Sequence, residues 1–180
     1  MNNIYYKDLK IKYICEKSLK NTYIRIDKDS NIVLKTPISS KRKIGSIIEQ
    51  KEAWIRKKLA YNLENPPLYL NLDGIDSLQS KEYLKEKVKY FSSKMGLFCN
   101  EVKFRKMKSR WGSCNSKGVI TLNKKLIKTP EICIDYVVVH ELAHLKYFNH
   151  SKRFHALVDR YSPDAKKAKE ILSRVVFLQE

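Results

Sequence analysis

The sequence predicts an α+β protein, and three observations support this class. Short segments in which Ile, Val, Tyr and Thr alternate with polar residues occupy residues 8–36 and recur within residues 102–123. Longer segments with apolar residues at helical spacing lie between and after these two groups. The elements do not follow the strand–helix alternation that builds a parallel sheet. We therefore expect a β-rich module with one helix over residues 1–65 and a second α+β module over residues 66–180.

The first module is expected to contain three strands and one helix. The segments LKIKYIC, NTYIRID and NIVLKT give the strands, and the polar residues 28–31 form a tight turn between the last two. Ser39 or Ser40 then caps a helix over residues 41–62. Its apolar stripe consists of Ile44, Ile47, Ile48, Trp54, Ile55 and Leu59. We expect Trp54 to lie in the core rather than to stack on a ligand.

The second module is expected to begin after a connection. Residues 63–79 carry two prolines, a glycine and several Asn and Asp, which is typical of a linker, and they include one candidate short strand, YLNL. Ser80 is then placed to cap a helix over residues 81–95, and Gly96 is placed to end it.

The remaining elements are two strands and three helices. VKFRKM and VITLN predict the strands, with SRWGSC as a turn and NSKG as the tight turn before VITLN. The helices are expected over residues 131–148, 151–161 and 164–177, started by Thr129 with Pro130, by Ser151 and by Ser162 with Pro163.

Composition and charge limit the class of protein. No apolar segment approaches the ~20 residues needed to cross a bilayer, and the first residues do not form a secretory signal. Four separated cysteines without a CxxC pair indicate free thiols in a reducing, cytoplasmic setting. The net charge of +18 would attract a polyanion such as nucleic acid or a nucleotide. However, 29 of the 37 basic residues are lysine, which biased genomic composition also produces, so both explanations stay open.

The segment VVVHELAHLKYFNH, residues 137–150, carries the strongest chemical signal. His140 and His144 are four residues apart on a predicted helix, so their imidazoles lie on one face and can bind one metal ion. Glu141 lies about 100° around the helix, where it can reach a water on the same ion. This HExxH spacing predicts two metal ligands and a general base.

A third ligand is needed to complete such a site, and His150 is the first candidate. If the helix continued, His150 would lie roughly 100° from the face of the other two histidines, so a break between residues 147 and 151 is expected. Three histidines and a water form the open tetrahedral site of catalytic zinc, Zn²⁺. Rival acidic ligands are Asp159, Asp164 and Glu170. We interpret His155 as a core histidine or a hydrogen-bond partner of a ligand.

Several of these segments resemble one protein family. The segments are RWGSC, VITLN, DYVVVHELAHL, NHS, Phe154 and Pro163-Asp164. They are similar to segments of the YgjP-like metallopeptidases, which are related to SprT-like proteins and to zincins. The resemblance implies a zincin-like catalytic module with His140, His144 and His150 as zinc ligands and Glu141 as the catalytic base. The three histidines also have the spacing found in metzincins, but two features differ from that class of zinc protease. Tyr147 stands where a metzincin has glycine, and no methionine follows Met107 to form a Met-turn. His155 stands where tryptophan is expected in relatives.

Three functions are compatible with this site. The first is a cytoplasmic zinc peptidase that hydrolyses peptide or protein substrates, with VITLN either pairing with an extended peptide or serving as an ordinary strand. The second is a metal-dependent hydrolase of nucleotides or other phosphoanhydrides. The third, by analogy with SprT-like proteins, is a DNA-associated protease. In each, Arg110 could stabilise an oxyanion or bind phosphate.

Overall fold

The computed structural model describes residues 2–177 and confirms the α+β class. The chain divides into two compact units, Met1–Pro67 and Leu68–Glu180, which are described separately below. None of the helices within residues 2–177 combines the length and the apolar character that crossing a bilayer requires.

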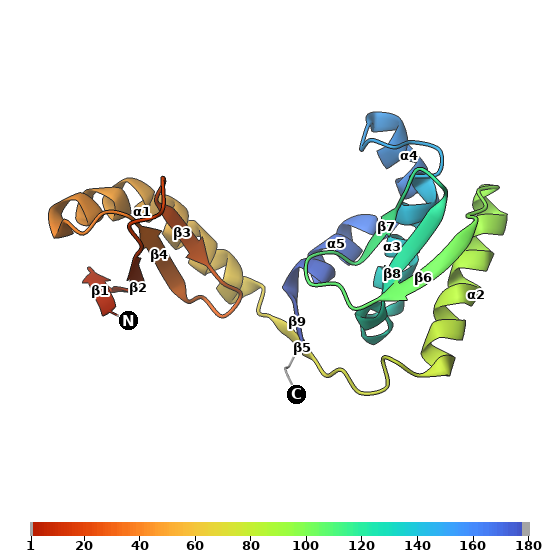
Figure 1. Ribbon diagram of the computed structural model, residues 1–180, viewed down its shortest axis with the longest axis horizontal. Helices are drawn as coiled ribbons and strands as arrows, with labels where there is room; N and C mark the ends of the chain where they lie inside the picture. The colour runs from red at the N-terminus through yellow and green to blue at the C-terminus, as the bar shows by residue number, and fades with distance from the viewer. Residues whose placement is uncertain (1, 178–180) are drawn as a thin grey trace. The chain divides into compact units, whose positions relative to one another are not determined.

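The N-terminal unit is a four-stranded sheet with one helix along one face (Figure 1). Its elements are β1 (Asn2–Tyr6), β2 (Leu9–Cys15), β3 (Tyr23–Ile26), β4 (Ile32–Thr36) and α1 (Lys41–Glu64). The strand order is β1-β2-β4-β3, in which only β2 and β4 run parallel. Strand β1 was not predicted. It pairs with β2 through a tight turn in which Lys7 has a positive φ of 52°.

The prediction that Trp54 lies in the core is wrong, because its side chain is 48% exposed. Ile44, Ile48 and Ile55 fall within about 40° of one another around α1 and are buried against the sheet, whereas Trp54 lies roughly 80–120° from each of them. The next position on the buried face is Asn62, which donates a hydrogen bond of 2.8 Å to the carbonyl of Asp27.

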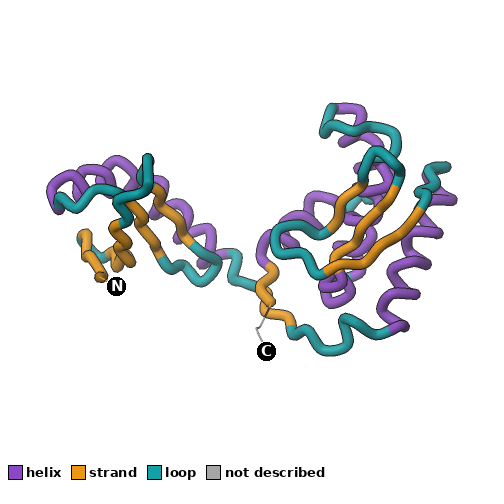
Figure 2. The backbone as a smooth tube through the Cα atoms, in the orientation of Figure 1, coloured by secondary structure: helices purple, strands orange, loops and turns teal. Residues whose placement is uncertain are grey.

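The C-terminal unit places a three-stranded sheet and a small parallel pair of strands around one central helix. Its elements are β5 (Leu68–Leu70), α2 (Leu78–Met95), β6 (Glu101–Arg105), β7 (Gly112–Cys114), β8 (Val119–Asn123), the 3₁₀ helix η1 (Lys124–Lys128), α3 (Glu131–Ala143), α4 (Lys152–Tyr161), α5 (Ala165–Arg174) and β9 (Val175–Phe177). The sheet has the order β6-β8-β7 and is drawn in orange in Figure 2; β5 pairs with β9.

Helix α3 carries the HExxH segment and is the centre of this unit. It packs against α2, α4, α5 and β7. Residues 137–139 are at most 3% exposed, so the helix is buried just before the HExxH segment. A helix that is buried on several sides holds its side chains in fixed positions, which suits it to carry a site.

Several predicted boundaries of this unit are wrong. Helix α2 is capped by Ser77, whose Oγ accepts a hydrogen bond from the Ser80 amide, so the helix begins one turn earlier than expected. Gly96 ends it with φ of 64°, as predicted. The Thr129 hydroxyl donates to the carbonyl of Leu126 instead of capping α3.

Two segments adopt a different structure from the predicted one. SRWGSC was expected to be a turn, but its last three residues form strand β7, which pairs antiparallel with β8. The last helix was expected to reach residue 177, but it ends at Arg174 because Val175–Phe177 forms β9 beside β5. Each strand is defined by pairing with another segment, β7 with the nearby β8 and β9 with the distant β5, and the pattern within three residues does not reveal it.

Candidate metal centre

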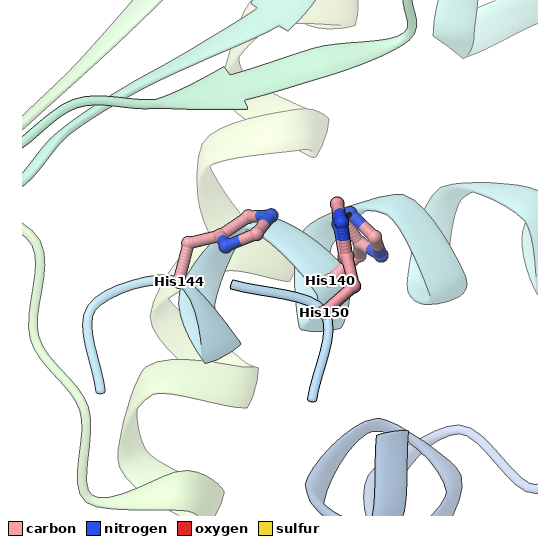
Figure 3. A group of neighbouring side chains, drawn as sticks. All are labelled: His140, His144 and His150. Carbon is pink, nitrogen blue, oxygen red and sulfur yellow. Dashed lines mark hydrogen bonds between the residues drawn. The ribbon is translucent and has the colours of Figure 1, made fainter. Parts of the chain in front are cut away.

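Three histidine side chains meet at the end of α3 (Figure 3). His140 lies in the last turn of α3, and His144 is the C-cap residue of that helix. His150 comes from the loop between α3 and α4, drawn in teal in Figure 2. Their ligand nitrogens all lie within 4.8 Å of one another.

The spacing of the rings fits a single metal ion. The Nε2 atoms of His140 and His150 are 3.2 Å apart. Two nitrogens that each bind a tetrahedral zinc at ~2.0–2.1 Å lie roughly 3.3 Å apart. The ring centroids of the three pairs are separated by 4.9 to 5.1 Å. The donor set therefore fits a small divalent cation with three imidazole ligands.

The outer nitrogens of two rings are held by hydrogen bonds. Nδ1 of His144 lies 3.1 Å from the carbonyl oxygen of Tyr147, which can only accept, so the hydrogen is on Nδ1 and the lone pair of the neutral ring is on Nε2. Nδ1 of His140 lies 3.3 Å from the hydroxyl of Tyr136. Such partners fix the tautomer and the orientation of metal-binding histidines.

A buried aromatic ring supports all three imidazoles. Phe154 of α4 is fully buried, and its ring centroid lies 4.9 Å from that of His140, 4.6 Å from that of His144 and 4.8 Å from that of His150. The Oγ of Ser151 accepts a hydrogen bond of 3.4 Å from the amide of Phe154, so the predicted cap of this helix also places the supporting ring.

The chain leaves the helical path earlier than predicted. The expected helix through residue 148 is wrong, because α3 ends at Ala143 and a turn follows. The amide of Leu145 donates to the carbonyl of Leu142 at 3.0 Å, a tighter pattern than that of an α-helix. This early end gives the loop enough residues to turn back and bring His150 beside His140.

The alternative ligands take no part in the cluster. Among residues 2–177, the three histidines form the one group of three or more potential ligands close enough to share an ion. The three acidic alternatives are exposed residues: Asp159 of α4, Asp164 at the start of α5 and Glu170 within α5. His155 is also exposed, not a core residue as expected, and its ring is stacked 6.1 Å from that of His150.

Burial favours the neutral form of two of the histidine rings, His140 and His144, and the protonated form of the Cys114 thiol. Burial, aided by the neighbouring histidines, lowers the pKa of His140 to about 4, and burial also lowers the pKa of His144. Burial and the nearby Glu141 raise the pKa of Cys114 to about 11. Neutral imidazoles have a free electron pair for a metal, whereas a protonated thiol does not.

Glu141 lies against the backbone of the edge strand β7. Its side chain is buried, and burial raises its pKa to about 7, although the charge of Arg110 opposes this rise. A Cβ added at Gly112 would lie 2.6 Å from Oε1 of Glu141 and 2.7 Å from its Cγ. Only glycine at this position therefore leaves room for the carboxyl group where it stands.

Asn123 holds the segment that contains Arg110. The Asn123 side-chain amide donates to the carbonyls of Met107 and Arg110 at 2.9 Å each, and its backbone amide donates to the carbonyl of Trp111 at 2.8 Å. The Arg110 side chain itself is exposed. Asn123 thus fixes the backbone of the loop that leads into β7.

Sequence reasoning missed three residues that build this site. Gly112 could have been noticed because a glycine within a strand often marks a close approach of another group. Tyr136 stands four residues before His140 and so on the same side of the helix. Asn123 carried no local signal, because its partners lie in a loop whose path depends on the fold.

Of the two roles left open for VITLN, pairing with a peptide or serving as an ordinary strand, the structure supports the ordinary strand. This segment is β8, the central strand, and it is bonded to β6 on one side and to β7 on the other. Strand β7 is the edge that lies beside α3 and Glu141. Within the described sheet, the outer edge of β7 has no strand partner.

Comparisons with known proteins identify the family. The model of the YgjP-like metallopeptidase domain matches residues 70–175. The crystal structure of the metallopeptidase zymogen abylysin from Pyrococcus abyssi is 28% identical, with a TM-score of 0.43, and the match covers 49% of this chain and 87% of that one. That of the metallopeptidase zymogen jannalysin from Methanocaldococcus jannaschii is 23% identical, also with a TM-score of 0.43, and the match covers 49% and 94%.

No curated protein matches the chain. The family model spans more than half of the 180 residues and includes Gly112, Glu141 and all three histidines. The chain therefore belongs to the YgjP-like metallopeptidases and is a metal-dependent hydrolase.

Proposed function

We propose that the chain is a zinc peptidase in which His140, His144 and His150 bind the ion and Glu141 is the general base. The observation that carries this proposal is the group of three histidine nitrogens within 4.8 Å of one another, next to a buried carboxyl group. Three imidazoles suit zinc, although iron, cobalt, manganese and nickel also occupy such sites. A zinc ion there would polarise a substrate carbonyl and lower the pKa of water toward ~7.

Glu141 is suited to move protons near neutral pH. A group transfers protons best when its pKa is close to the working pH, and burial brings the pKa of Glu141 to about 7. Its contact with Gly112 limits the positions that the carboxyl group can take. Glu141 can then accept a proton from water and return it to the leaving amine.

Strand β7 provides a place for an extended peptide. An edge strand can pair with a peptide through main-chain hydrogen bonds, which fixes the position of the bond to be cleaved. The residues of β7, Gly112–Cys114, lie beside Glu141, so a peptide on this edge would pass the carboxyl group. Arg110, just before β7, lies close enough for its charge to act on Glu141, and it would stabilise negative charge that develops on the substrate.

The test compares three substrate classes on one preparation. Protein loaded with one equivalent of zinc is offered casein, short peptides and nucleoside triphosphates, and Glu141→Gln serves as the control. We expect peptide-bond hydrolysis that is lost in the variant while zinc content is unchanged. Turnover of triphosphates alone, also lost in the variant, would overturn the peptidase assignment in favour of a phosphoanhydride hydrolase.

A further inference from the structure

The sheet of the N-terminal unit has one covered and one open face. The covered face packs on the buried isoleucines of α1 through Leu9, Ile11, Ile32 and Leu34. Because side chains alternate along a strand, the residues between them point to the other side of the sheet. This outer face consists of Asn3 and Tyr5 of β1, Lys10, Lys12 and Ile14 of β2, Val33 and Lys35 of β4, and Tyr23 and Arg25 of β3.

The outer face is positively charged and uncompensated. It carries four cations, Lys10, Lys12, Arg25 and Lys35, and none of the strands β1 to β4 contains an Asp or Glu. Within residues 2–177 these cations form no ion pair, whereas Lys7 pairs with Glu52, and Arg56 pairs with Asp8 and Glu52. Ion pairs thus neutralise Lys7 and Arg56, whereas the four cations of the outer face stay available for a ligand.

Two tyrosines on this face are unusually exposed. Tyr5 is 72% exposed and Tyr23 is 54% exposed. In the antiparallel pairs, Tyr5 lies directly opposite Lys10, and Tyr23 lies directly opposite Lys35. Side chains in such positions have Cβ atoms ~4.5–5.5 Å apart. Each aromatic ring therefore has an ammonium group within reach, so one ligand could contact both.

The remaining cations continue the charge across the sheet. One row of paired residues crosses all four strands, in the order Asn3 of β1, Lys12 of β2, Val33 of β4 and Arg25 of β3. With strands ~4.8 Å apart, Arg25 and Lys12 are separated by about 10 Å. A flexible anionic chain lying along this row would meet positive charge on β3 and β2 and would pass between the two tyrosines.

We propose that the outer face binds single-stranded nucleic acid, with Tyr5 and Tyr23 stacking on bases and the four cations contacting phosphates. Exposed aromatic rings interleaved with cations on a sheet suit unpaired bases, which offer flat faces for stacking. A duplex keeps its bases stacked on one another and would leave both tyrosines unused. This proposal concerns the N-terminal unit and is independent of the metal centre.

The experiment measures binding of the full chain to labelled oligothymidine and oligouridine by fluorescence anisotropy over a range of salt concentrations. We expect Lys12→Glu with Lys35→Glu to weaken binding at least about tenfold and to reduce the salt slope by roughly 1.4, since each phosphate contact on a single strand contributes ~0.7. Tyr5→Ser with Tyr23→Ser should also weaken binding about tenfold or more, through lost stacking. The tyrosine changes should leave the salt slope unchanged.

The matched control is Lys43→Glu with Lys57→Glu, which makes the same charge change at exposed positions of α1. Circular dichroism verifies that all variants are folded. Equal weakening by the control pair would show diffuse attraction and overturn the proposal. It would also fail if the tyrosine changes had no effect, or if duplex DNA or phosphatidylglycerol vesicles bound as tightly and through the same residues.

Discussion

Gly112 and Glu141 are in direct contact, and the contact leaves no space for a side chain at residue 112. A Cβ there would lie 2.6 to 2.9 Å from three atoms of the Glu141 side chain, Oε1, Cγ and Cδ. Because Glu141 is buried, a side chain at residue 112 forces either the carboxyl group or strand β7 to move. Either movement changes how the proposed base lies relative to this strand.

Gly112→Ala is therefore expected to lower kcat/KM for peptides about 100-fold, the size of effect that a displacement of ~1 Å can have. Zinc content, measured by mass spectrometry, should stay near that of the unchanged protein. Gly45→Ala is the control, since a Cβ at Gly45 meets nothing within 4 Å. Normal activity of Gly112→Ala would mean that Glu141 tolerates displacement and that its position is not critical.

Tyr136→Phe removes the hydroxyl group beside Nδ1 of His140 and little else. The bond is 3.3 Å long, and loss of such partners typically weakens metal affinity 10–100-fold. We expect weaker zinc binding in a competition titration with a chromogenic chelator. Tyr161→Phe, at a half-buried tyrosine of α4, is the control. An unchanged zinc affinity would show that packing alone orients His140.

Phe154→Leu keeps an apolar side chain but removes the ring that contacts all three imidazoles. We expect about tenfold weaker zinc binding together with a lower free energy of unfolding, because the smaller side chain leaves a cavity. Val158→Ala, at a buried position of the same helix, should lower stability while leaving zinc affinity unchanged. Similar behaviour of both variants in the chelator titration would reduce the role of Phe154 to general packing.

The parts of this site that the sequence predicted are those set by local geometry. His140 and His144 share a helix face because a helix has 3.6 residues per turn, and Ser151 caps α4 because its hydroxyl reaches an amide three residues on. Strands β2, β3 and β4 followed from alternation of apolar and polar residues, although β1 did not, and Gly96 followed from the need for a positive φ.

The parts that failed depend on partners outside their own segment. Strands β7 and β9 are three residues long, and each is defined by its pairing, β7 with the nearby β8 and β9 with the distant β5. The place of Gly112 against Glu141 required the sheet to lie on α3, which no local pattern encodes. Trp54 failed for a different reason, because hydrophobic character was given more weight than its angle around the helix.

The ion pairs between α2 and α3 make the stability of the C-terminal unit depend on pH. Lys87 forms ion pairs with Glu131 and Asp135, the latter at 2.8 Å. The hydrogen bond from Lys87 lowers the pKa of Glu131. Burial lowers the pKa of Lys87, but Asp135 and Glu131 outweigh it and raise the pKa overall.

The sign of each contribution follows from these shifts. The lowered pKa of Glu131 gives stability above its ordinary value of 4.5 that is lost as the pH falls through the folded value. The raised pKa of Lys87 gives stability below 10.5 that is lost at higher pH. Lys87→Met should therefore lower Tm near pH 7, with a difference from the unchanged protein that shrinks near pH 3.

Lys85→Met is the control for this measurement, because the one ion pair of Lys85 within residues 2–177 is with the exposed Glu82 of its own helix. It should change Tm little at either pH. A loss of stability in Lys87→Met that is equally large near pH 3 would assign the effect to lost packing of the lysine side chain rather than to charge.

His150 decides whether the loop after α3 completes the metal centre. It is the one member of the cluster outside the HExxH segment, and its Nε2 lies 3.2 Å from that of His140. His150→Ala should therefore lose most of its zinc on dialysis, and a cobalt-substituted sample should lose the visible absorption of a four-coordinate ion. His155→Ala, next to Phe154 but outside the cluster, should keep both. Full retention of zinc by His150→Ala would exclude it as the third ligand, and loss of zinc in Asp159→Ala, Asp164→Ala or Glu170→Ala would then identify an acidic ligand in its place.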